Sequence, residues 1–292
     1  MNKASNQNIT NWLLLLSLTL IWGSSYILIK KGLVAFAPIE LGVLRLSLSF
    51  LATSPFLYSA LKDKSPKNYG RILTVGLLGT GIPVFLFAFS TTKISSSVNG
   101  IINSLSPLFT VITGAVFFQL SIQKQKMYGV LIGLVGAMVL VIGRYGFNFN
   151  LSAYALLSVA ATFCYGTNSN FVKQYFPQAN ALHITAIAMA MMGIPATFVL
   201  FGMGVPTKII THPEAVKSLL GVVFLAVFGT VIAWMIFYKL VQRTDALFAA
   251  SVTYLIPIVA LTFGLIDGEG FSSIQVLGMA LILLGVYFVS RK

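Results

Sequence analysis

One apolar run places four polar residues on the same side of a predicted helix. Within residues 94–122 they are Ser96, Asn99, Asn103 and Ser106, which fall within about 80° of one another on a helical wheel. Two amides one turn apart offer donors and acceptors that bind the ammonium and carboxylate of an amino acid without a buried charge. We therefore expect Asn99 and Asn103 to line a binding cavity, with hydrogen bonding between helices as the alternative.

Two further runs carry aromatic and polar side chains at the spacing of one helix face. Trp22, Ser25 and Tyr26 follow the i, i+3, i+4 pattern, and near the middle of the chain the same pattern recurs in Tyr165, Asn168 and Ser169. Such a face suits a small amphipathic solute. Because unpaired polar groups are costly in lipid, both faces are expected to point into the protein, toward a cavity or a neighbouring helix.

The second half of the chain adds three candidates for the same binding site. Trp234 is expected to form another aromatic wall, whereas Tyr238, at the end of its run, is expected to be an anchor at the membrane interface. Thr253 stands 150 residues after Asn103, the spacing at which other motifs recur in the chain, and Tyr254 lies beside it. We therefore assign Trp234, Thr253 and Tyr254 to the predicted site.

Arg45 is the one formal charge well inside a predicted span. Burying a charge in a membrane is costly, so such a residue is a functional candidate by default. Its run begins only about five residues earlier, near Glu40, so the long side chain can also reach outward. We expect an anchor to a headgroup or carbonyl, with an electrostatic gate or a contact to a substrate carboxylate as alternatives. His183, alone on an apolar run, is expected to be packed there.

The composition excludes most classes of soluble protein. The 292 residues are 57% hydrophobic and 9% charged, and the mean hydropathy is +0.91, whereas soluble domains carry about a quarter charged residues. The 19 Lys and Arg outnumber the 6 Asp and Glu, but they are scattered singly between apolar runs, which argues against nucleic-acid binding. We predict a polytopic membrane protein whose surroundings are lipids.

Ten runs are long and apolar enough to cross a bilayer, and two of them hold one ionisable group each, Arg45 and His183. The predicted fold class is therefore all-α, with ten transmembrane helices. Because ten is even, both termini lie on one side of the membrane. The connections on that side hold about twice as many Lys and Arg as the opposite ones, which predicts cytoplasmic termini.

The two halves of the chain share motifs in the same order. Trp22-Gly23-Ser24 corresponds to Tyr165-Gly166-Thr167, and at an offset of 150 residues Gly79-Thr80 corresponds to Gly229-Thr230 and Pro107 to Pro257. One residue off that register, Gly129 and Gly136 correspond to Gly278 and Gly285. We predict two five-helix halves, residues 8–146 and 147–292. Since five is odd, the second half enters the membrane from the opposite side, as in many transporters.

These motifs resemble the EamA-type, ten-helix branch of the drug/metabolite transporter superfamily, from about Trp12 to Ser290. The matching features are Trp22-Gly23-Ser24-Ser25, Arg45, Gly79-Thr80, Pro107, Tyr165-Gly166, Gly229-Thr230, Pro257 and Gly268-Glu269. The resemblance implies an inverted repeat that moves small metabolites, often amino acids outward, across a bacterial inner membrane. The first half has Phe118-Gln119 where the family often has Gly-Glu, so that glutamate is not needed in both halves.

Other activities lack their motifs. The sequence has no glycine-rich phosphate-binding pattern, no cluster of metal ligands and one cysteine, Cys164, which is expected to be a small core residue. We predict a secondary transporter or facilitator, not an enzyme, that needs no cofactor and exports small metabolites by alternating access around a central cavity. A non-transporting scaffold or sensor is the alternative. The sequence leaves the oligomeric state open and is compatible with a monomer.

Overall fold

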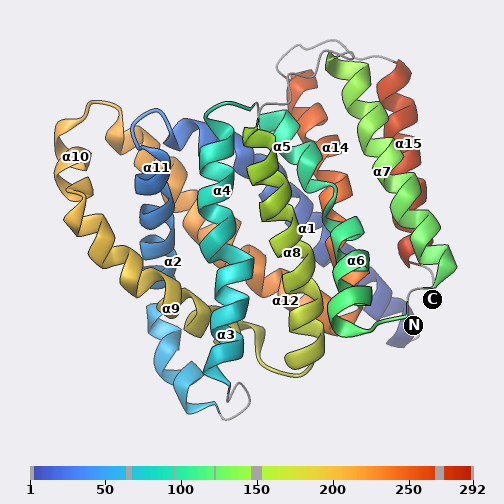
Figure 1. Ribbon diagram of the computed structural model, residues 1–292, viewed down its shortest axis with the longest axis horizontal. Helices are drawn as coiled ribbons and strands as arrows, with labels where there is room; N and C mark the ends of the chain where they lie inside the picture. Colours follow the sequence, from blue (N-terminus) through green and yellow to red (C-terminus); the bar gives the residue numbers. More distant parts are fainter. Residues whose placement is uncertain are drawn as a thin grey trace.

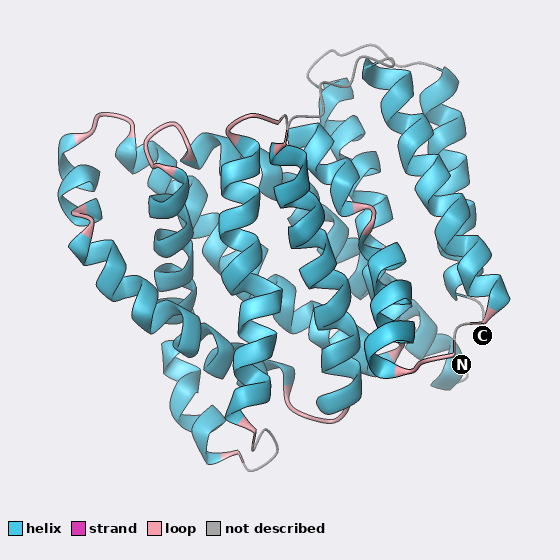
Figure 2. Ribbon diagram, in the orientation of Figure 1, coloured by secondary structure: helices cyan, strands magenta, loops and turns pink. Residues whose placement is uncertain are grey.

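The apolar runs form helices throughout the part of the chain that the structure describes. The structure, a computed structural model, describes residues 3–63, 68–94, 96–121, 123–145, 153–266 and 273–290, and within these ranges it contains helices and no β-strand (Figure 2). A helix satisfies its own backbone hydrogen bonds, which is why long apolar segments adopt it in lipid. The predicted all-α fold class is confirmed.

Five helical stretches among the described residues are long and apolar enough to cross a membrane. They are α1 (Lys3–Gly32), α2 (Pro38–Lys62), α3–η1–α4 (Tyr69–Gly76, Leu77–Gly81 and Ile82–Thr91), α9 (Ala181–Gly202) and α11–η2–α12 (Ala215–Ala226, Val227–Ile232 and Ala233–Arg243). The elements η1 and η2 are turns of π-helix.

Five more rods complete the bundle. They are α5 (Ser96–Asn103) with α6 (Ser106–Phe118), α7 (Lys124–Tyr145), α8 (Tyr154–Tyr175), α13 (Ala246–Ala250) with α14 (Val252–Ile266), and α15 (Ser273–Ser290). The short helix α10 (Val205–Thr211) connects α9 to α11. The described residues thus form ten rods, which is the number of membrane-spanning segments that the sequence predicts.

The rods run up and down in turn, so that α1 begins and α15 ends at the same end of the bundle, at the lower right of Figure 1. The contacts between elements link the two halves of the chain. The rod pairs with extensive contacts are α2 with α9, α7 with α15, α4 with α8, α6 with α8, α1 with α11 and α12, and α1 with α14. No half packs mainly against itself.

The two Gly-Thr motifs occupy the two π-helical turns. Gly79-Thr80 lies in η1 and Gly229-Thr230 in η2, each near the middle of its rod. In η2 the Thr230 hydroxyl donates to the carbonyl of Leu225, five residues earlier (2.9 Å), which fits the wider turn. Turns of this kind are rare and occur often at functional sites.

The rods that contain Pro107 and Pro257 are interrupted, but not in the same way. The first rod breaks at residues 104–105, and Pro107 stands in the first turn of α6, where its missing N–H costs nothing. The second rod breaks at Ser251, and Pro257 lies inside α14. The two helix interruptions therefore fall at different positions of the internal repeat, although each proline lies near an interruption.

Glycines let α7 and α15 approach each other at backbone distance. A Cβ atom on Gly129 would lie 2.8 Å from the Gly285 carbonyl oxygen, and one on Gly136 would lie 2.9 Å from that of Gly278. A Cβ atom on Gly285 would in turn lie 2.5 Å from the Gly133 nitrogen. The contact is the close helix packing that small residues permit in membranes.

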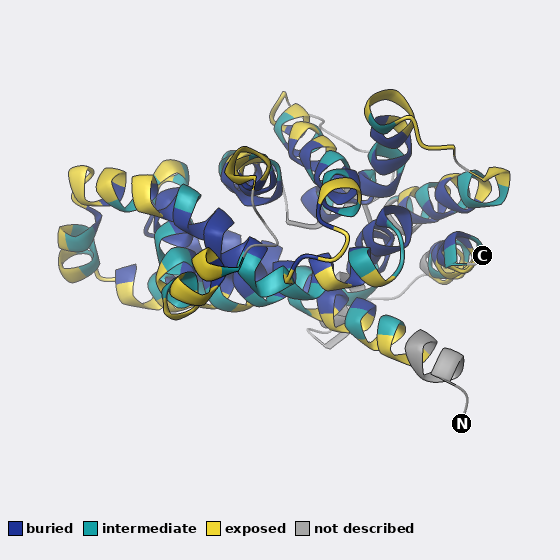
Figure 3. Cartoon of the chain, turned by 90° about the horizontal axis from the view of Figure 1, so that it is seen from below, coloured by how far each residue is buried: buried dark blue, intermediate teal, exposed yellow. Residues whose placement is uncertain are grey.

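Exposed residues lie along the outer faces of the helices (Figure 3), and many of them are large and apolar. Phe198 and Leu156 are 76% and 68% exposed, whereas Asn99, Asn168 and many serines and threonines are buried. A water-soluble protein rarely exposes apolar surface on this scale, so lipid is the surrounding that fits it.

Candidate functional site

A cavity lies where rods from both halves meet. Tyr165 on its wall is halfway along α8, and Gly229 is at the midpoint of the α11–η2–α12 rod, so the cavity is far from the ends of both. Its lining residues are Trp22, Ser25, Tyr26, Ile29, Arg45, Phe87, Asn103, Ser106, Tyr165, Ser169, Gly229, Trp234, Phe237, Ala250 and Thr253. The volume of about 50 Å³ has room for a few water molecules.

Six aromatic rings form a continuous wall of this cavity. Their contacts run from Tyr26 to Phe87 (5.6 Å between ring centroids), Tyr165 (5.8 Å), Trp234 (5.6 Å), Trp22 (5.5 Å) and Phe237 (5.4 Å). Three of the six rings come from the first half of the sequence and three from the second, and they contact one another across the halves. The wall therefore exists only when the two halves are packed together. Ring faces of this kind bind apolar groups and attract cations.

Arg45 points into the bundle and contacts η2. Its Nε donates to the Thr230 hydroxyl (2.8 Å) and its Nη2 to the Gly229 carbonyl (3.4 Å), and the residue is 8% exposed. Trp22 Nε1 donates to the same Gly229 carbonyl (3.1 Å). The expected anchoring to a carbonyl is therefore present, but it is directed to the cavity and not outward to a headgroup.

The polar side of the cavity is formed near the two helix interruptions. Asn103, the last residue of α5, shares a hydrogen bond with Tyr26, and its Oδ1 accepts one from the Ser106 hydroxyl (3.2 Å). Ser104 donates to the Thr253 carbonyl (3.2 Å), which joins this region to α14. Amide, hydroxyl and guanidinium groups thus share one small space with the aromatic wall.

Asn99 does not line the cavity, unlike Asn103 one turn later. It is fully buried and its Oδ1 accepts hydrogen bonds from the Ser90 (2.8 Å) and Ser158 hydroxyls, while its Nδ2 donates to Thr91 (3.1 Å). Asn99 therefore joins α4, α5 and α8, which is the alternative role that the sequence allowed. The side chain of Ser96 lies outside the described residues.

Asn168 and Tyr254 also lie outside the lining of the cavity. Asn168 Nδ2 donates to the Tyr238 hydroxyl (3.4 Å), and the Tyr254 hydroxyl donates to the Val130 carbonyl (2.8 Å). Tyr238 itself is 1% exposed and packs on Trp234, with 5.2 Å between ring centroids, so its predicted role as an interface anchor is wrong. These three residues hold helices together.

The structure brings seven of the ten predicted binding residues to the cavity, together with Arg45. They are Trp22, Ser25, Tyr26, Asn103, Tyr165, Trp234 and Thr253. Four further lining residues look like any other apolar residue of a span, so the sequence does not predict them: Ile29, Phe87, Phe237 and Ala250. Gly229 and Ser169 carried a signal, since both belong to the repeated motifs.

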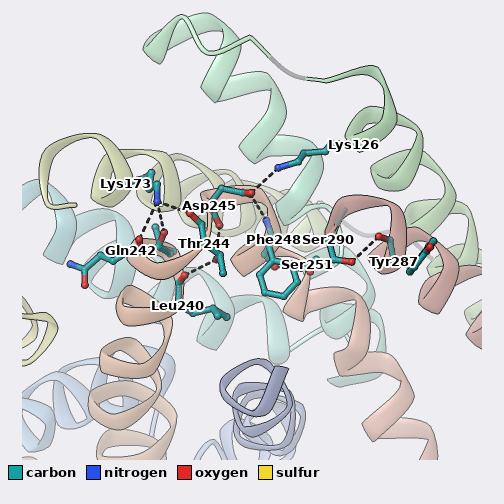
Figure 4. Close-up of polar contacts among 11 residues, drawn as sticks. Lys126, Lys173, Leu240, Gln242, Thr244, Asp245, Phe248, Ser251, Tyr287 and Ser290 are labelled. Carbon is teal, nitrogen blue, oxygen red and sulfur yellow. Dashed lines mark hydrogen bonds and ion pairs between the residues drawn. The ribbon is translucent and has the colours of Figure 1, made fainter. Parts of the chain in front are cut away.

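A polar network lies at the end of the bundle at which α1 begins (Figure 4). Lys173 Nζ donates to three carbonyls at the end of α12, those of Val241 (3.1 Å), Gln242 (3.2 Å) and Thr244 (2.6 Å). Asp245 caps α13 through the Phe248 N–H (2.8 Å) and pairs with Lys126 (2.7 Å). The network thereby links α7, α8, α12 and α13.

A His–Asp contact and a further ion pair stand at the ends of the rods. His183 Nδ1 lies 2.6 Å from Asp63 Oδ2, so His183 is not simply packed on an apolar face as predicted. At the opposite end Lys208 pairs with Glu40 (2.6 Å). Asp267 and Glu269, including the Gly-Glu pair of the resemblance, lie outside the described residues. No group of three or more potential metal ligands occurs among the described residues.

Long apolar helices around a central polar and aromatic cavity define a multi-pass membrane protein of the transporter class. A model of the EamA-like transporter family matches residues 10–142 and 152–291. The chain therefore belongs to the EamA-like transporter family, and it is a membrane transporter.

Relatives of known sequence span nearly the whole chain. An uncharacterized transporter of Archaeoglobus fulgidus is 26% identical over 96% of this chain and 99% of its own length. A probable amino-acid metabolite efflux pump of Salmonella typhimurium is 24% identical over 94% and 92%, and the uncharacterized inner membrane transporter YedA of Escherichia coli is 24% identical over 94% and 89%. A crystal structure of a protein shares the fold, with a TM-score of 0.70, 18% identity and 96% of each chain covered.

Proposed function

We propose that the protein is a secondary transporter or facilitator that exports small amphipathic metabolites, with amino acids as the favoured class. The observation that carries this proposal is the central cavity, in which Arg45, Asn103 and the aromatic wall meet. The relative named as a probable amino-acid metabolite efflux pump supports the class of solute and the direction. On this proposal the protein performs no covalent chemistry and needs no cofactor, and its partners are the solute and the surrounding lipid.

The proposal includes two inverted repeats, residues 8–146 and 147–292. If the first five rods correspond to the last five, the contact of α4 with α8 corresponds to that of the α11–η2–α12 rod with α1, and α6 with α8 corresponds to α14 with α1. Contacts of α2 with α9 and of α7 with α15 correspond to themselves. The two Gly-Thr π-turns occupy equivalent rods as well.

The glycine contacts between α7 and α15 support the same relation. Gly129 corresponds to Gly278 and Gly136 to Gly285, so a two-fold axis turns the contact of Gly129 with Gly285 into the contact of Gly278 with Gly136. Both contacts are present. We infer that the halves are related by a pseudo-two-fold axis and rock about the cavity, which is how inverted repeats alternate access.

The cavity is smaller than a metabolite site, since such sites occupy roughly 300–1,000 Å³. With about 50 Å³ available, an amino acid enters only after the aromatic rings move apart. We infer that this arrangement is a contracted one and that the cavity widens when either end opens.

We propose an inner-membrane location with both termini in the cytoplasm. The end of the bundle where α1 begins carries Lys62, Arg71, Lys124, Lys126, Lys173, Lys239 and Arg243 at or near helix ends. The opposite end carries fewer, namely Lys30, Lys31, Lys93, Lys208 and Lys217 among residues with described side chains. This asymmetry favours the first end as cytoplasmic.

Flux measurements test the proposal. Pure protein in liposomes should give saturable flux of at least one labelled amino acid above protein-free liposomes, measured across a panel with and without a pH gradient. Absence of flux for every amino acid and related amine, from protein that is folded, would overturn the proposal and favour the scaffold or sensor.

A further inference from the structure

Arg45 is a buried positive charge without a carboxylate partner among the described residues. Its side chain donates to neutral oxygens of Thr230 and Gly229, at 2.8 and 3.4 Å. Buried charges in proteins are normally paired, because the loss of hydration is costly. The two neutral acceptors orient the guanidinium group but leave its charge uncompensated.

The carboxylates of the described chain stand elsewhere and cannot serve Arg45. Glu40, Asp63 and Asp245 each lie at the end of a rod and pair with Lys208, His183 and Lys126. Glu214 is exposed in the turn before α11. An anion that neutralises Arg45 therefore has to come from outside the described part of the protein.

The guanidinium group still has donors to offer. Its five N–H groups form a planar fork, of which Nε and Nη2 contact η2, and Arg45 lines the cavity beside Tyr26, Tyr165 and Trp22. A fork that faces a small cavity among apolar rings can bind a carboxylate through two parallel hydrogen bonds, and low local polarity strengthens them. The remaining walls, Asn103 and the ring faces, suit an amide-bonding group or an ammonium.

We propose that Arg45 binds the carboxylate of the transported solute, so that a carboxylate is a requirement for transport. This inference rests on the proposed function and narrows its substrate class. Amines and amides derived from a transported amino acid, which keep the side chain and lose the negative charge, are poor ligands. Thr230 and the Gly229 carbonyl are positioning groups, because they hold the guanidinium toward the cavity.

Binding to the purified protein tests the inference without a flux measurement. The apparent melting temperature in detergent is recorded with each amino acid, with its amide and with the amine that lacks the carboxyl group, all at millimolar concentration. A ligand that binds only the folded state raises this temperature. We expect the acids that bind to raise it and the matching amides and amines to require at least about tenfold higher concentration for the same rise.

Two variants of Arg45 and one control sharpen the test. Arg45→Gln should abolish the difference between acid and amide, and Arg45→Lys should keep a preference for the acid with weaker binding, since it retains the charge without the fork. Arg243→Gln is the control, since it also removes one positive charge. The Nε of Arg243 donates to Asn11 (2.9 Å) at the surface, so this variant should behave as the wild type. If Arg45→Gln does not fold, the wild-type preference and Arg45→Lys still decide the outcome.

The outcomes separate the inference from the proposed function. If an amino acid is transported and its amide and amine inhibit that flux as well as the unlabelled acid does, the carboxylate requirement is overturned. The transport function is then left intact. An acid-specific melting shift that disappears in Arg45→Gln supports the inference even where no flux is detected. If no carboxylate gives either a melting shift or flux, both the inference and the proposed function are overturned.

Discussion

The contact of α7 with α15 should not tolerate a single added methyl group at Gly136. In Gly136→Ala the new Cβ atom would lie 2.6 Å from the Ile282 nitrogen, and ordinary contact begins at 3.4 Å, so the helices must separate by about 3.4 − 2.6 = 0.8 Å. The obstacles are backbone atoms, which cannot rotate away as a side chain would. Overpacking of this kind costs about 1–3 kcal/mol.

Alanine also gains about 1 kcal/mol over glycine in a helix, which offsets part of that cost. Gly202→Ala isolates this gain, since a Cβ atom on Gly202, at the end of α9, would meet nothing within 4 Å. Unfolding in mixed detergent micelles should therefore place Gly136→Ala about 1–3 kcal/mol below Gly202→Ala in stability. Equal stability of the two variants would refute the close helix approach.

Two other predictions concern the network and the asparagines. Lys173→Met leaves three carbonyls at the end of α12 without their donor, so its free energy of unfolding should fall by about 2 kcal/mol. Thermal unfolding should show this as a lower apparent melting temperature. Lys239→Met, at an exposed position, should match the wild type. Asn99→Leu leaves the buried Ser90 hydroxyl without its acceptor, although Ser158 can still donate to Ser90 (2.6 Å), and it should cost about 1–3 kcal/mol of stability. Asn103→Leu should fold and lose most of its flux in liposomes. A drop in flux without a loss of stability for Asn99→Leu would reverse these roles.

The sequence predicts the helical fold well because lipid imposes it. Long apolar runs have no other way to satisfy their backbone, so the rods follow from composition and length. The matched Gly-Thr motifs also predict a shared feature of two rods. The Gly-Thr motif alone does not predict a π-helical turn, because the turn is accompanied by tertiary contacts such as that of Arg45 with Thr230.

The candidate site is predictable only in part, since spacing gives a face and not its partner. Asn99 and Asn103 share one predicted face, yet Asn99 contacts Ser158 and Asn103 lines the cavity, where α5 ends and the helix is interrupted. Phe87 and Phe237 carry no signal, since a ring in an apolar run reads as core. Three-dimensional neighbours decide such cases.

The central claim is that solute passes through the cavity, and two adjacent serines of α1 test it most directly. Ser25 lines the cavity, whereas Ser24 faces an apolar groove with Ile27 and Phe224. A phenylalanine ring at position 25 would project into a cavity that has room for only a few water molecules. In liposomes, Ser25→Phe should lose amino-acid flux while Ser24→Phe, folded to the same extent, keeps it. Undiminished flux through folded Ser25→Phe would contradict the account.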